Sequence, residues 1–371
     1  MNRVCCIFNI PSLYREAIYQ EIDKSFDCEW YFEEQNTDIS LFDTAKLKAC
    51  HFLKSESVVG RFYRVKGLFS SIRKRKDFDS YLMIGAPMCI SIWILCLYLK
   101  LFQPKKKIYF WTHGWYGKET AFERIVKKTF LRLADDLFLY GNYAKDQLER
   151  QGFSSEKLHV IHNSLSYDVQ LKLRHEMVET DVYRNHFGNE YPVLIFIGRL
   201  TPVKKLDMIL DALDLLNRKG NHYNLVFVGD GSEKETLVEK ANVLGLSDQV
   251  WFHGACYDEA RNSELIYNAD LCVAPGNIGL TAIHTLMFGC PAVTHDDFPY
   301  QMPEFEAIIS GKTGDFFERN NVLSLVDVID GWFQINNTHR DIVRECCYKE
   351  IDVQWNPLYQ INIIRTVFNN A

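Results

Sequence analysis

Two basic side chains in one short loop are the strongest candidates for chemistry in this 371-residue chain. The apolar run Val193–Gly198 is followed by Arg199 and Lys204 and then by a helical pattern. In sheets of alternating strands and helices, ligands bind outside the carboxyl ends of the strands, and helix N-termini attract anions. We therefore expect Arg199 and Lys204 to clamp a diphosphate, the plainer alternative being an ordinary basic loop.

Two further loops have the composition of a phosphate cradle. Gly229-Asp230-Gly231 follows the next apolar run, and the glycine-rich segment Pro275–Thr281 again precedes a helix, with His284 one turn into it. Glycine lets the backbone approach a ligand closely, and consecutive amides can bind phosphate. Three such loops on one sheet edge point to a nucleotide diphosphate as the ligand.

The elements that must position these loops alternate in two blocks. Strand-like and helix-like runs alternate from Val4–Ile10 to Leu158–His162, and again from Val193–Gly198 to Ala292–Thr294. Such alternation predicts α/β architecture with parallel, doubly wound sheets. The polar segment between the blocks is predicted to be a linker, and Trp355–Phe368 a helix that packs across the junction. We expect an N-terminal domain over residues 1–165, a linker over 166–190, a C-terminal domain over 191–352 and a closing helix over 353–371.

Composition places the chain among globular proteins of a reducing compartment. Hydrophobic residues make up 47% and charged residues 24%, enough for sizeable cores. The 11 cysteines include no CxxC motif, which argues against disulfide frameworks and zinc fingers. We expect no secretory signal and hence a cytoplasmic location. Ser80–Leu99 carries no charge over 20 residues, but Pro87 divides it, so a buried strand and helix are expected rather than a membrane span.

Charge is distributed unevenly along the chain. Residues 1–190 hold 28 basic and 24 acidic side chains, whereas residues 191–371 hold 14 and 24. The densest basic and aromatic stretch is Arg61–Lys76. Such a patch fits anionic lipid head groups at about 1 kcal/mol per charge, a plain solvated face being the alternative. Nucleic acid is not expected as a partner, because no motif that reads RNA or DNA accompanies the patch.

Further short motifs accompany the three loops in a fixed order. They are Gly198-Arg199-Leu200 with Lys204, Gly229-Asp230-Gly231, Val250-Trp251-Phe252-His253-Gly254, Gly289-Cys290-Pro291, Pro303-Glu304 and Lys312-Thr313-Gly314. In this order they resemble the donor domain of GT-B fold glycosyltransferases of the large retaining family 4. The resemblance covers roughly residues 155–320. Upstream, His113, which follows Phe110–Thr112, resembles the histidine of the family's first domain.

This resemblance implies roles for individual residues. Arg199 and Lys204 would hold the donor diphosphate and stabilise the charge of the departing nucleotide. His113 would face the donor sugar and the acceptor hydroxyl, the alternative being a histidine bonded to backbone. The implied donor-binding residues are Gly198, Arg199, Lys204, Gly229, Asp230, Asn277, Gly279, Leu280, Thr281 and His284. The family needs no metal, and neither a metal nor another cofactor is expected here.

The chain departs from the family pattern at two positions. The family usually carries two glutamates, with seven residues between them, ahead of the motif at Gly289; here those positions hold Gly276 and His284. The second glutamate normally contacts the ribose, and a histidine can still make such a hydrogen bond. The first normally contacts the donor sugar; glycine cannot replace it, and the neighbouring Asn277 is the candidate substitute. The departure makes a divergent or inactive member an open alternative.

The segment after the first strand is the candidate acceptor side. Pro11-Ser12-Leu13-Tyr14-Arg15 is similar to the opening of family members that assemble polysaccharides. The resemblance implies that Tyr14 and Arg15 lie at the cleft edge, suited to a sugar or phosphate of the acceptor. Capping of a helix N-terminus by Ser12 is a second role, and both can hold.

These observations together predict a GT-B glycosyltransferase with two Rossmann-like domains facing a central cleft and a C-terminal helix crossing back to the first domain. It would transfer a hexosyl group, with retention and without a metal, from a nucleotide-diphosphate sugar to a glycan or lipid-linked acceptor. We expect a role in bacterial surface polysaccharide assembly, in the cytoplasm or at the cytoplasmic face of the inner membrane. Two alternatives stay open: a nucleotide-sugar epimerase, which the basic first domain disfavours, and a non-catalytic scaffold, which Gly276 and His284 favour.

Overall fold

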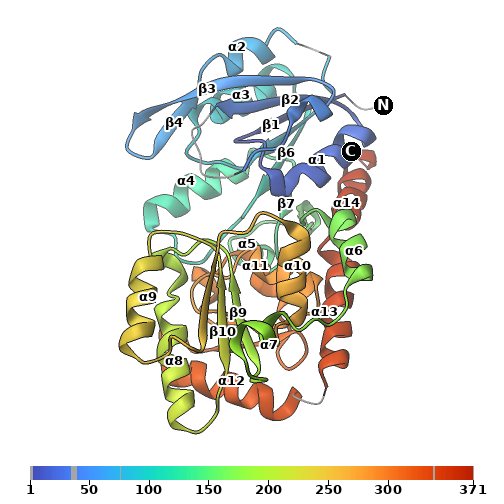
Figure 1. The fold of residues 1–371 in the computed structure, drawn as a ribbon. Helices are drawn as coiled ribbons and strands as arrows, with labels where there is room; N and C mark the ends of the chain where they lie inside the picture. Colours follow the sequence, from blue (N-terminus) through green and yellow to red (C-terminus); the bar gives the residue numbers. More distant parts are fainter. Residues whose placement is uncertain (1–2, 35–39, 76, 337–338, 371) are drawn as a thin grey trace. The chain divides into compact units, whose positions relative to one another are not determined.

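A computed structural model describes residues 3–34, 40–75, 77–336 and 339–370. The chain forms two compact units (Figure 1). The first unit comprises residues 1–166 and 356–371, and the second comprises residues 167–355. Each unit is built on its own sheet, so the α/β fold with two Rossmann-like domains is confirmed.

The sheet of the first unit has eight strands in the order β4-β3-β2-β1-β5-β6-β7-β8. Neighbouring strands run parallel, except for the antiparallel pair β3 and β4. The order reverses between β1 and β5, which lie side by side, so the crevice outside their carboxyl ends is the expected ligand position. The strands are β1 (Arg3–Phe8), β2 (Asp27–Glu34), β3 (Cys50–Val59), β4 (Phe62–Val65), β5 (Ser80–Ile84), β6 (Lys107–Thr112), β7 (Asp136–Leu139) and β8 (Leu158–Val160).

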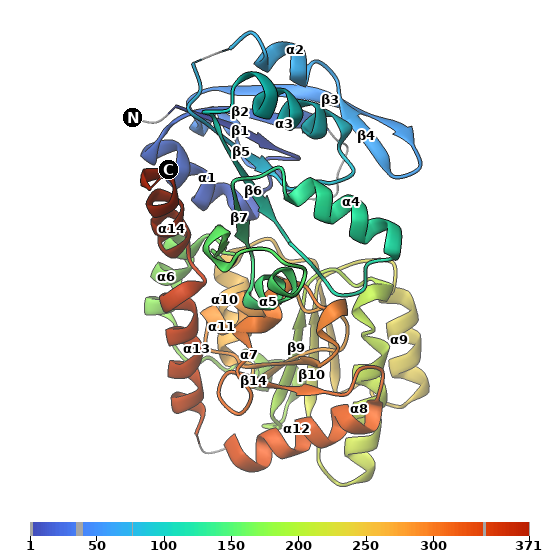
Figure 2. The ribbon, with the colours of Figure 1, turned by 180° about the vertical axis from the view of Figure 1, so that it is seen from behind.

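Helices cover both faces of this sheet (Figure 2). Side chains of β1 alternate between two apolar cores: Cys5 and Ile7 join one, and Val4, Cys6 and Phe8 join the other. The first core includes side chains of α2 to α5, and the second those of α1 and α14. The helices are α1 (Glu16–Ser25), α2 (Leu68–Ile72), α3 (Ile90–Phe102), α4 (Ala121–Leu131), α5 (Asn142–Arg150) and α14 (Pro357–Asn369).

The C-terminal helix α14 returns to the first unit, as predicted. Asn356 caps it by accepting a hydrogen bond from the amide of Tyr359, and Pro357 occupies its first position. Phe368 then stacks on Tyr109 of β6 with 4.4 Å between ring centroids. The helix also packs against α1 (Figure 1).

The segment Ser80–Leu99 is a buried strand followed by a helix, as its sequence predicts. Among the described residues, no helix has the length and apolar character to cross a bilayer. The β3–β4 hairpin has no counterpart in our sequence-based expectations. Most of β3 is exposed or half-buried, so its sequence lacks the continuous apolar run of a central strand.

The second unit holds a six-stranded, fully parallel sheet in the order β11-β10-β9-β12-β13-β14. Its order reverses between β9 and β12. The strands are β9 (Val193–Ile197), β10 (Asn224–Val228), β11 (Val250–Gly254), β12 (Leu271–Ala274), β13 (Ala292–His295) and β14 (Gly314–Phe317). Its helices are α6 (Tyr167–Glu176), α7 (Val182–Phe187), α8 (Asp207–Arg218), α9 (Lys234–Val243), α10 (Glu259–Asn268), α11 (Thr281–Met287), α12 (Val322–Asn336) and α13 (Arg340–Gln354).

The linker expected over residues 166–190 was wrong: this segment contains α6 and α7 and is part of the second unit. Two buried polar side chains attach it. Gln170 donates a hydrogen bond to Glu259 of α10 at 2.7 Å, and the hydroxyl of Tyr183 donates to the carbonyl of Leu265 at 2.7 Å. Because these attachments are polar, the segment lacks the apolar period by which a helix is recognised in sequence.

Candidate functional site

The three candidate loops of the second unit are joined at the reversal of the strand order. The amide of Gly276, after β12, donates to the carbonyl of Lys204, after β9, at 2.9 Å. The amide of Leu200 donates to the carbonyl of Asp230, after β10, also at 2.9 Å. Hydrogen bonds of the backbone therefore fix the loops predicted to bind phosphate against one another, at the edge where open α/β sheets bind ligands.

Two glycines make this close approach possible. A Cβ atom at Gly229 would lie 1.9 Å from the carbonyl oxygen of Gly198, and one at Gly276 would lie 2.1 Å from that of Val203. Neither position has room for a side chain. The glycine at 276, which replaces the glutamate of the resembling family, is thus a packing requirement of this loop.

Lys204 lies inside the joined loops. Its Nζ donates to the backbone oxygen of Asn277 at 2.6 Å and to the side-chain oxygen at 2.9 Å. Burial lowers the pKa of Lys204, the carboxylate of Glu304 opposes this, and the charge of Arg199 adds to the lowering, so that the pKa is about 8. The ammonium group is therefore still mostly charged at neutral pH, and it loses its proton more readily than an exposed lysine.

Arg199 is exposed just after β9, and its side chain makes no hydrogen bond or ion pair with the described residues. With Lys204 nearby, it gives the loop edge two positive charges. The predicted pairing of Arg199 and Lys204 in one loop is seen in the structure, while their contact with a diphosphate stays a prediction.

Gln301 is a positioning residue that our reading of the sequence missed. This side chain, 3% exposed, accepts a hydrogen bond from the amide of Ile278 at 3.0 Å and donates to Thr294 at 2.8 Å. The hydroxyl of Thr294 in turn donates to the carbonyl of Gly276 at 3.1 Å. No sequence motif identifies Gln301, because its contact with Ile278 spans 23 residues of the chain.

His284 lies one turn into α11 and is paired. Its Nε2 lies 2.9 Å from a carboxylate oxygen of Glu259, the first residue of α10. Burial would raise the pKa of Glu259, but the imidazole of His284 and the hydrogen bonds from His284, Gln170 and Asn262 lower it overall. The position where the family has one glutamate thus holds a histidine with a carboxylate attached from a neighbouring helix.

The remaining predicted donor residues lie around this edge. Gly279 has a φ of +57°, in the left-handed region, and the hydroxyl of Thr281 donates to the carbonyl of Ile197 at 2.9 Å. Leu280 is the N-cap residue of α11. Asp230 is exposed, and its carboxylate is 3.0 Å from Lys234. The hydrogen bond from Lys234 is the main cause that lowers the pKa of Asp230.

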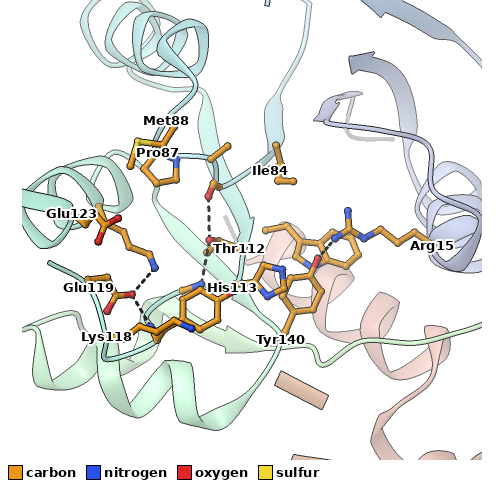
Figure 3. A pocket seen from close by; sticks show the side chains of 16 residues that line it. Arg15, Ile84, Pro87, Met88, Thr112, His113, Lys118, Glu119, Glu123 and Tyr140 are labelled. Carbon is orange, nitrogen blue, oxygen red and sulfur yellow. Dashed lines mark hydrogen bonds and ion pairs between the residues drawn. The ribbon is translucent and has the colours of Figure 1, made fainter. Parts of the chain in front are cut away.

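The first unit has a cavity of about 370 Å³ at the carboxyl ends of β1, β5, β6 and β7 (Figure 3). Such a volume is at the lower end of the range for small-molecule sites. Its lining combines an apolar wall with charged side chains and aromatic rings. The residues are Arg15, Ile84, Gly85, Ala86, Pro87, Met88, Trp111, Thr112, His113, Gly114, Tyr116, Lys118, Glu119, Glu123, Lys127 and Tyr140.

His113 lies in this cavity, directly after β6. Its ring centroid is 4.6 Å from that of Tyr140, and its Nδ1 atom is buried without a hydrogen-bond partner among the described residues. Burial, followed by the charges of Arg15 and Lys127, lowers the pKa of His113 to about 3. The imidazole is therefore neutral at physiological pH and is available as a hydrogen-bonding group rather than as a cation.

Tyr14 and Arg15, the residues predicted for the acceptor side, follow β1. Arg15 is 6% exposed and lies 5.2 Å from the ring centroid of Tyr14. Its guanidinium donates to the hydroxyl of Tyr140 at 2.5 Å, as Figure 3 shows. The expected capping by Ser12 was wrong: its hydroxyl makes no cap hydrogen bond, because Ser12 precedes a short 3-10 turn, Leu13–Arg15, and α1 begins only at Glu16.

The described residues contain no group of three or more His, Cys, Asp or Glu side chains arranged to hold a metal ion. Their 11 cysteines are free thiols.

Residues 179–345, which lie within the second unit, match the model of the family Glycosyl transferases group 1. A GDP-mannose-dependent alpha-(1-6)-phosphatidylinositol dimannoside mannosyltransferase of Mycobacterium tuberculosis is 29% identical over 155 residues, which are 41% of this chain and 38% of that protein. The chain thus spans well under half of that relative. The lipopolysaccharide 1,6-galactosyltransferase of Salmonella typhimurium is 21% identical over 291 residues, 75% of this chain and 73% of that protein.

Among solved structures, Anabaena HepE in complex with UDP matches over 100% of both chains, with a TM-score of 0.76 and 14% identity. At this sequence identity, the similarity shows a common fold and nothing further.

Proposed function

We propose that this chain, whose second unit matches the group 1 glycosyltransferases, transfers a sugar from a nucleotide-diphosphate donor to a glycan or lipid-linked acceptor. The observation that carries the proposal is the set of three loops joined at the strand-order reversal of the second unit. These loops present Arg199, Lys204 and backbone amides at one edge. Such an edge suits a diphosphate that gains negative charge as the glycosidic bond to the sugar breaks.

In this proposal, Arg199 makes the exposed contact with the diphosphate and Lys204 the buried one. Asn277 orients Lys204 through two hydrogen bonds. His284, held by Glu259, offers its imidazole to a ribose hydroxyl. The neutral imidazole of His113 hydrogen-bonds the donor sugar or the acceptor hydroxyl. Retention at the anomeric carbon and independence from metal belong to the proposal as properties of the resembling family.

We assign the acceptor to surface polysaccharide assembly, on the cytoplasmic face of the inner membrane. Support comes from the Salmonella relative, whose name gives it an acceptor in lipopolysaccharide. A non-catalytic homologue is the second candidate. Gly276 favours it, because no side chain can occupy the position from which the family's glutamate contacts the donor sugar.

The test is a thermal-shift panel of UDP, GDP and dTDP and their common sugars on the full chain. A ligand at 100 times its Kd stabilises the native state by about 2.7 kcal/mol. We expect a shift with one nucleotide family, lost in Arg199→Ala/Lys204→Ala. The matched control is Arg218→Ala/Lys219→Ala, two exposed basic residues at the opposite end of α8. If the protein melts cooperatively and no ligand changes its melting temperature, the donor-site assignment is overturned. Donor binding without transfer to any lipopolysaccharide or lipid-linked acceptor would favour the non-catalytic homologue.

A further inference from the structure

The cavity of the first unit contains a buried cation without a facing anion. Arg15 is 6% exposed, and its hydrogen bonds go to phenol oxygens, to Tyr140 at 2.5 Å and to Tyr19 at 3.4 Å. Among the described residues, no carboxylate lies within 4 Å of its guanidinium. The Nε atom of Arg15 makes no hydrogen bond to them at all.

The two carboxylates that line the cavity face cations other than Arg15. Lys127 is paired with Glu119 at 2.8 Å. Glu123 caps α4 through Thr120 and is paired with Arg61 at 2.9 Å. These carboxylates are therefore engaged elsewhere, and the positive charge of Arg15 is not neutralised by them.

Such an arrangement is costly unless a ligand offsets it. An arginine stays charged at any physiological pH, and a buried charge without a counter-charge is strongly unfavourable. Buried charges in proteins are accordingly paired or serve binding. Two further groups of the cavity lining have unused hydrogen-bonding atoms, the indole Nε1 of Trp111 and the Nδ1 of His113.

The cavity also has an apolar side. Ile84, at the end of β5, and Ala86, Pro87 and Met88, on the loop after it, line the cavity. Figure 3 shows Pro87 and Met88 across the cavity from Arg15 and Tyr140. A ligand that fits both sides has an anionic group next to an apolar or sugar moiety.

We infer that this cavity binds the acceptor through an anionic group, a phosphate or a carboxylate, which Arg15 recognises. The inference rests on the proposed function in so far as the ligand is the acceptor. It deepens that function by naming the chemistry of the acceptor: a sugar attached to a lipid phosphate, or a glycan that carries an acidic group beside the reacting sugar. Arg15 is a specificity-determining residue in this reading, and Trp111 and His113 are additional hydrogen-bonding groups.

The test measures binding of defined anions to the full chain by isothermal titration calorimetry. Farnesyl diphosphate represents a lipid phosphate, glucuronic acid an acidic sugar, and glucose the neutral control. We expect saturable binding of at least one of the two anions and much weaker binding of glucose. Arg15→Met, which keeps the size of the side chain and removes the charge, should weaken anion binding at least about 10-fold. Arg132→Met, at an exposed arginine of the same unit, should leave binding unchanged.

Stability separates recognition from a structural role. Removing an uncompensated buried charge should leave the melting temperature of Arg15→Met equal to or above that of the wild type in the absence of ligand. If Arg15→Met does not fold, Arg15→Lys replaces it: the retained charge should preserve anion binding at reduced affinity. Equal anion affinity in wild type and Arg15→Met, or no anion binding by the wild type, would overturn the inference.

Failure of this inference and failure of the proposed function are distinguishable. UDP binding tests the second unit, and we expect it to be unaffected by Arg15→Met. Loss of UDP binding in that variant would overturn the acceptor assignment, since the anion at Arg15 would then be the diphosphate of the donor. Absence of UDP binding with intact, Arg15-dependent anion binding would overturn the proposed function and leave the anion site standing.

Discussion

Lys204 and Asn277 are joined by two hydrogen bonds, from Nζ to the backbone oxygen at 2.6 Å and to the side-chain oxygen at 2.9 Å. The two residues stand 73 positions apart, on loops that follow different strands. Asn277 accepts hydrogen bonds from Lys204 but carries no charge. The loop therefore keeps the positive charge of Lys204, and Asn277 fixes the position of the ammonium group. This relationship makes the protonation of Lys204 the most sensitive property of the candidate donor site.

We predict that the affinity for the nucleotide diphosphate falls above about pH 8, because burial lowers the pKa of Lys204 to about 8. Below that pH the ammonium group is charged and attracts the diphosphate. Above it the proton is lost, and the affinity should decrease by up to about tenfold per pH unit. Calorimetric titration with the nucleotide from the panel, between pH 7 and 9.5, measures this. Lys204→Met should bind weakly with no such pH dependence, and a sloping profile in that variant would contradict the assignment.

Asn277→Asp is predicted to move the same profile. A carboxylate in contact with the ammonium group raises the pKa of Lys204 above about 8, so the decrease in affinity should begin at higher pH. At pH 7 the added negative charge opposes the diphosphate and should cost on the order of 1.4 kcal/mol, or about tenfold in affinity. Asn277→Ala, which retains the backbone acceptor, should have the smaller effect. An unchanged affinity in Asn277→Asp would show that the diphosphate does not bind here.

Gly276→Ala is predicted to destabilise the second unit by roughly 1–3 kcal/mol. The new Cβ atom would lie 2.1 Å from a backbone oxygen, and the loop would have to shift. The matched control is Gly279→Ala, whose Cβ would meet only Met302, at 3.8 Å. That variant should cost about 1–2 kcal/mol, from its left-handed backbone alone.

Urea denaturation measures the unfolding free energies of Gly276→Ala and Gly279→Ala. Nucleotide affinity is the second property to be measured. We expect Gly276→Ala to lose nucleotide affinity and Gly279→Ala to lose less. Gly276→Glu, which introduces the family's residue, should be the least stable of the three. If it were as stable as the wild type and bound the donor more tightly, Gly276 would be an open position rather than a packing requirement.

The sequence predicts the position of the candidate loops of the second unit well, because the determinants there are local. A buried strand, a glycine and a basic loop follow one another within a dozen residues from Val193, and the strand order places such loops on one edge. The same holds for α14, whose apolar period, with Asn356 and Pro357 before it, marks a helix.

The parts that sequence reasoning missed depend on contacts between distant residues. Gln301 holds a loop more than twenty positions away, and Glu259 is paired with His284 across 25 positions. Neither has a motif, because only the fold makes these residues neighbours. Buried polar attachments by Gln170 and Tyr183 likewise turn the expected linker into part of the second unit.

The pair formed by Glu259 and His284 is predicted to stabilise the second unit by about 1 kcal/mol. The two atoms are 2.9 Å apart, and the pKa of Glu259 is lowered overall despite its burial. A double-mutant cycle with Glu259→Gln and His284→Gln, followed by urea denaturation at pH 6, should give this coupling energy. The stabilisation should disappear as the pH falls and Glu259 becomes protonated. If the destabilisation of the double variant equals the sum of the two single effects, the two residues are not coupled.

We predict that His113 makes the first unit sensitive to acid. Its pKa is about 3 in the folded chain and close to 6.5 when exposed. The unfolded state therefore binds a proton between these values and the folded state does not, so stability decreases as the pH falls below about 6.5. The difference in unfolding free energy between wild type and His113→Asn, measured between pH 7 and 5, should change by up to about 1.4 kcal/mol per pH unit. A constant difference would contradict the buried, neutral imidazole.

Ion pairs within Arg61–Lys76 reduce the number of cations that are available for the predicted membrane contact. Arg64 and Lys66 are both paired with Glu56, and Arg75 is paired with Glu29 at 2.7 Å. Arg73 and Lys74 form no ion pair with the described residues, from which Lys76 is excluded. The exposed side chains Leu101 and Phe102, at the end of α3, lie on the helix that packs against α2.

Anionic vesicles should therefore bind mainly through Arg73 and Lys74. Charges near an anionic surface contribute about 1 kcal/mol each, so Arg73→Gln/Lys74→Gln should weaken binding to phosphatidylglycerol vesicles by about 10- to 30-fold. Arg64→Gln/Lys66→Gln removes the same number of charges but also frees Glu56, and serves as the matched control. Its effect should be smaller, because those cations are already partly neutralised and lie on β4 and the residue after it.

Co-sedimentation at low and at 0.5 M salt measures both variants. Equal losses in the two variants would indicate attraction by net charge alone, and no binding by the wild type would leave the basic stretch as a solvated face.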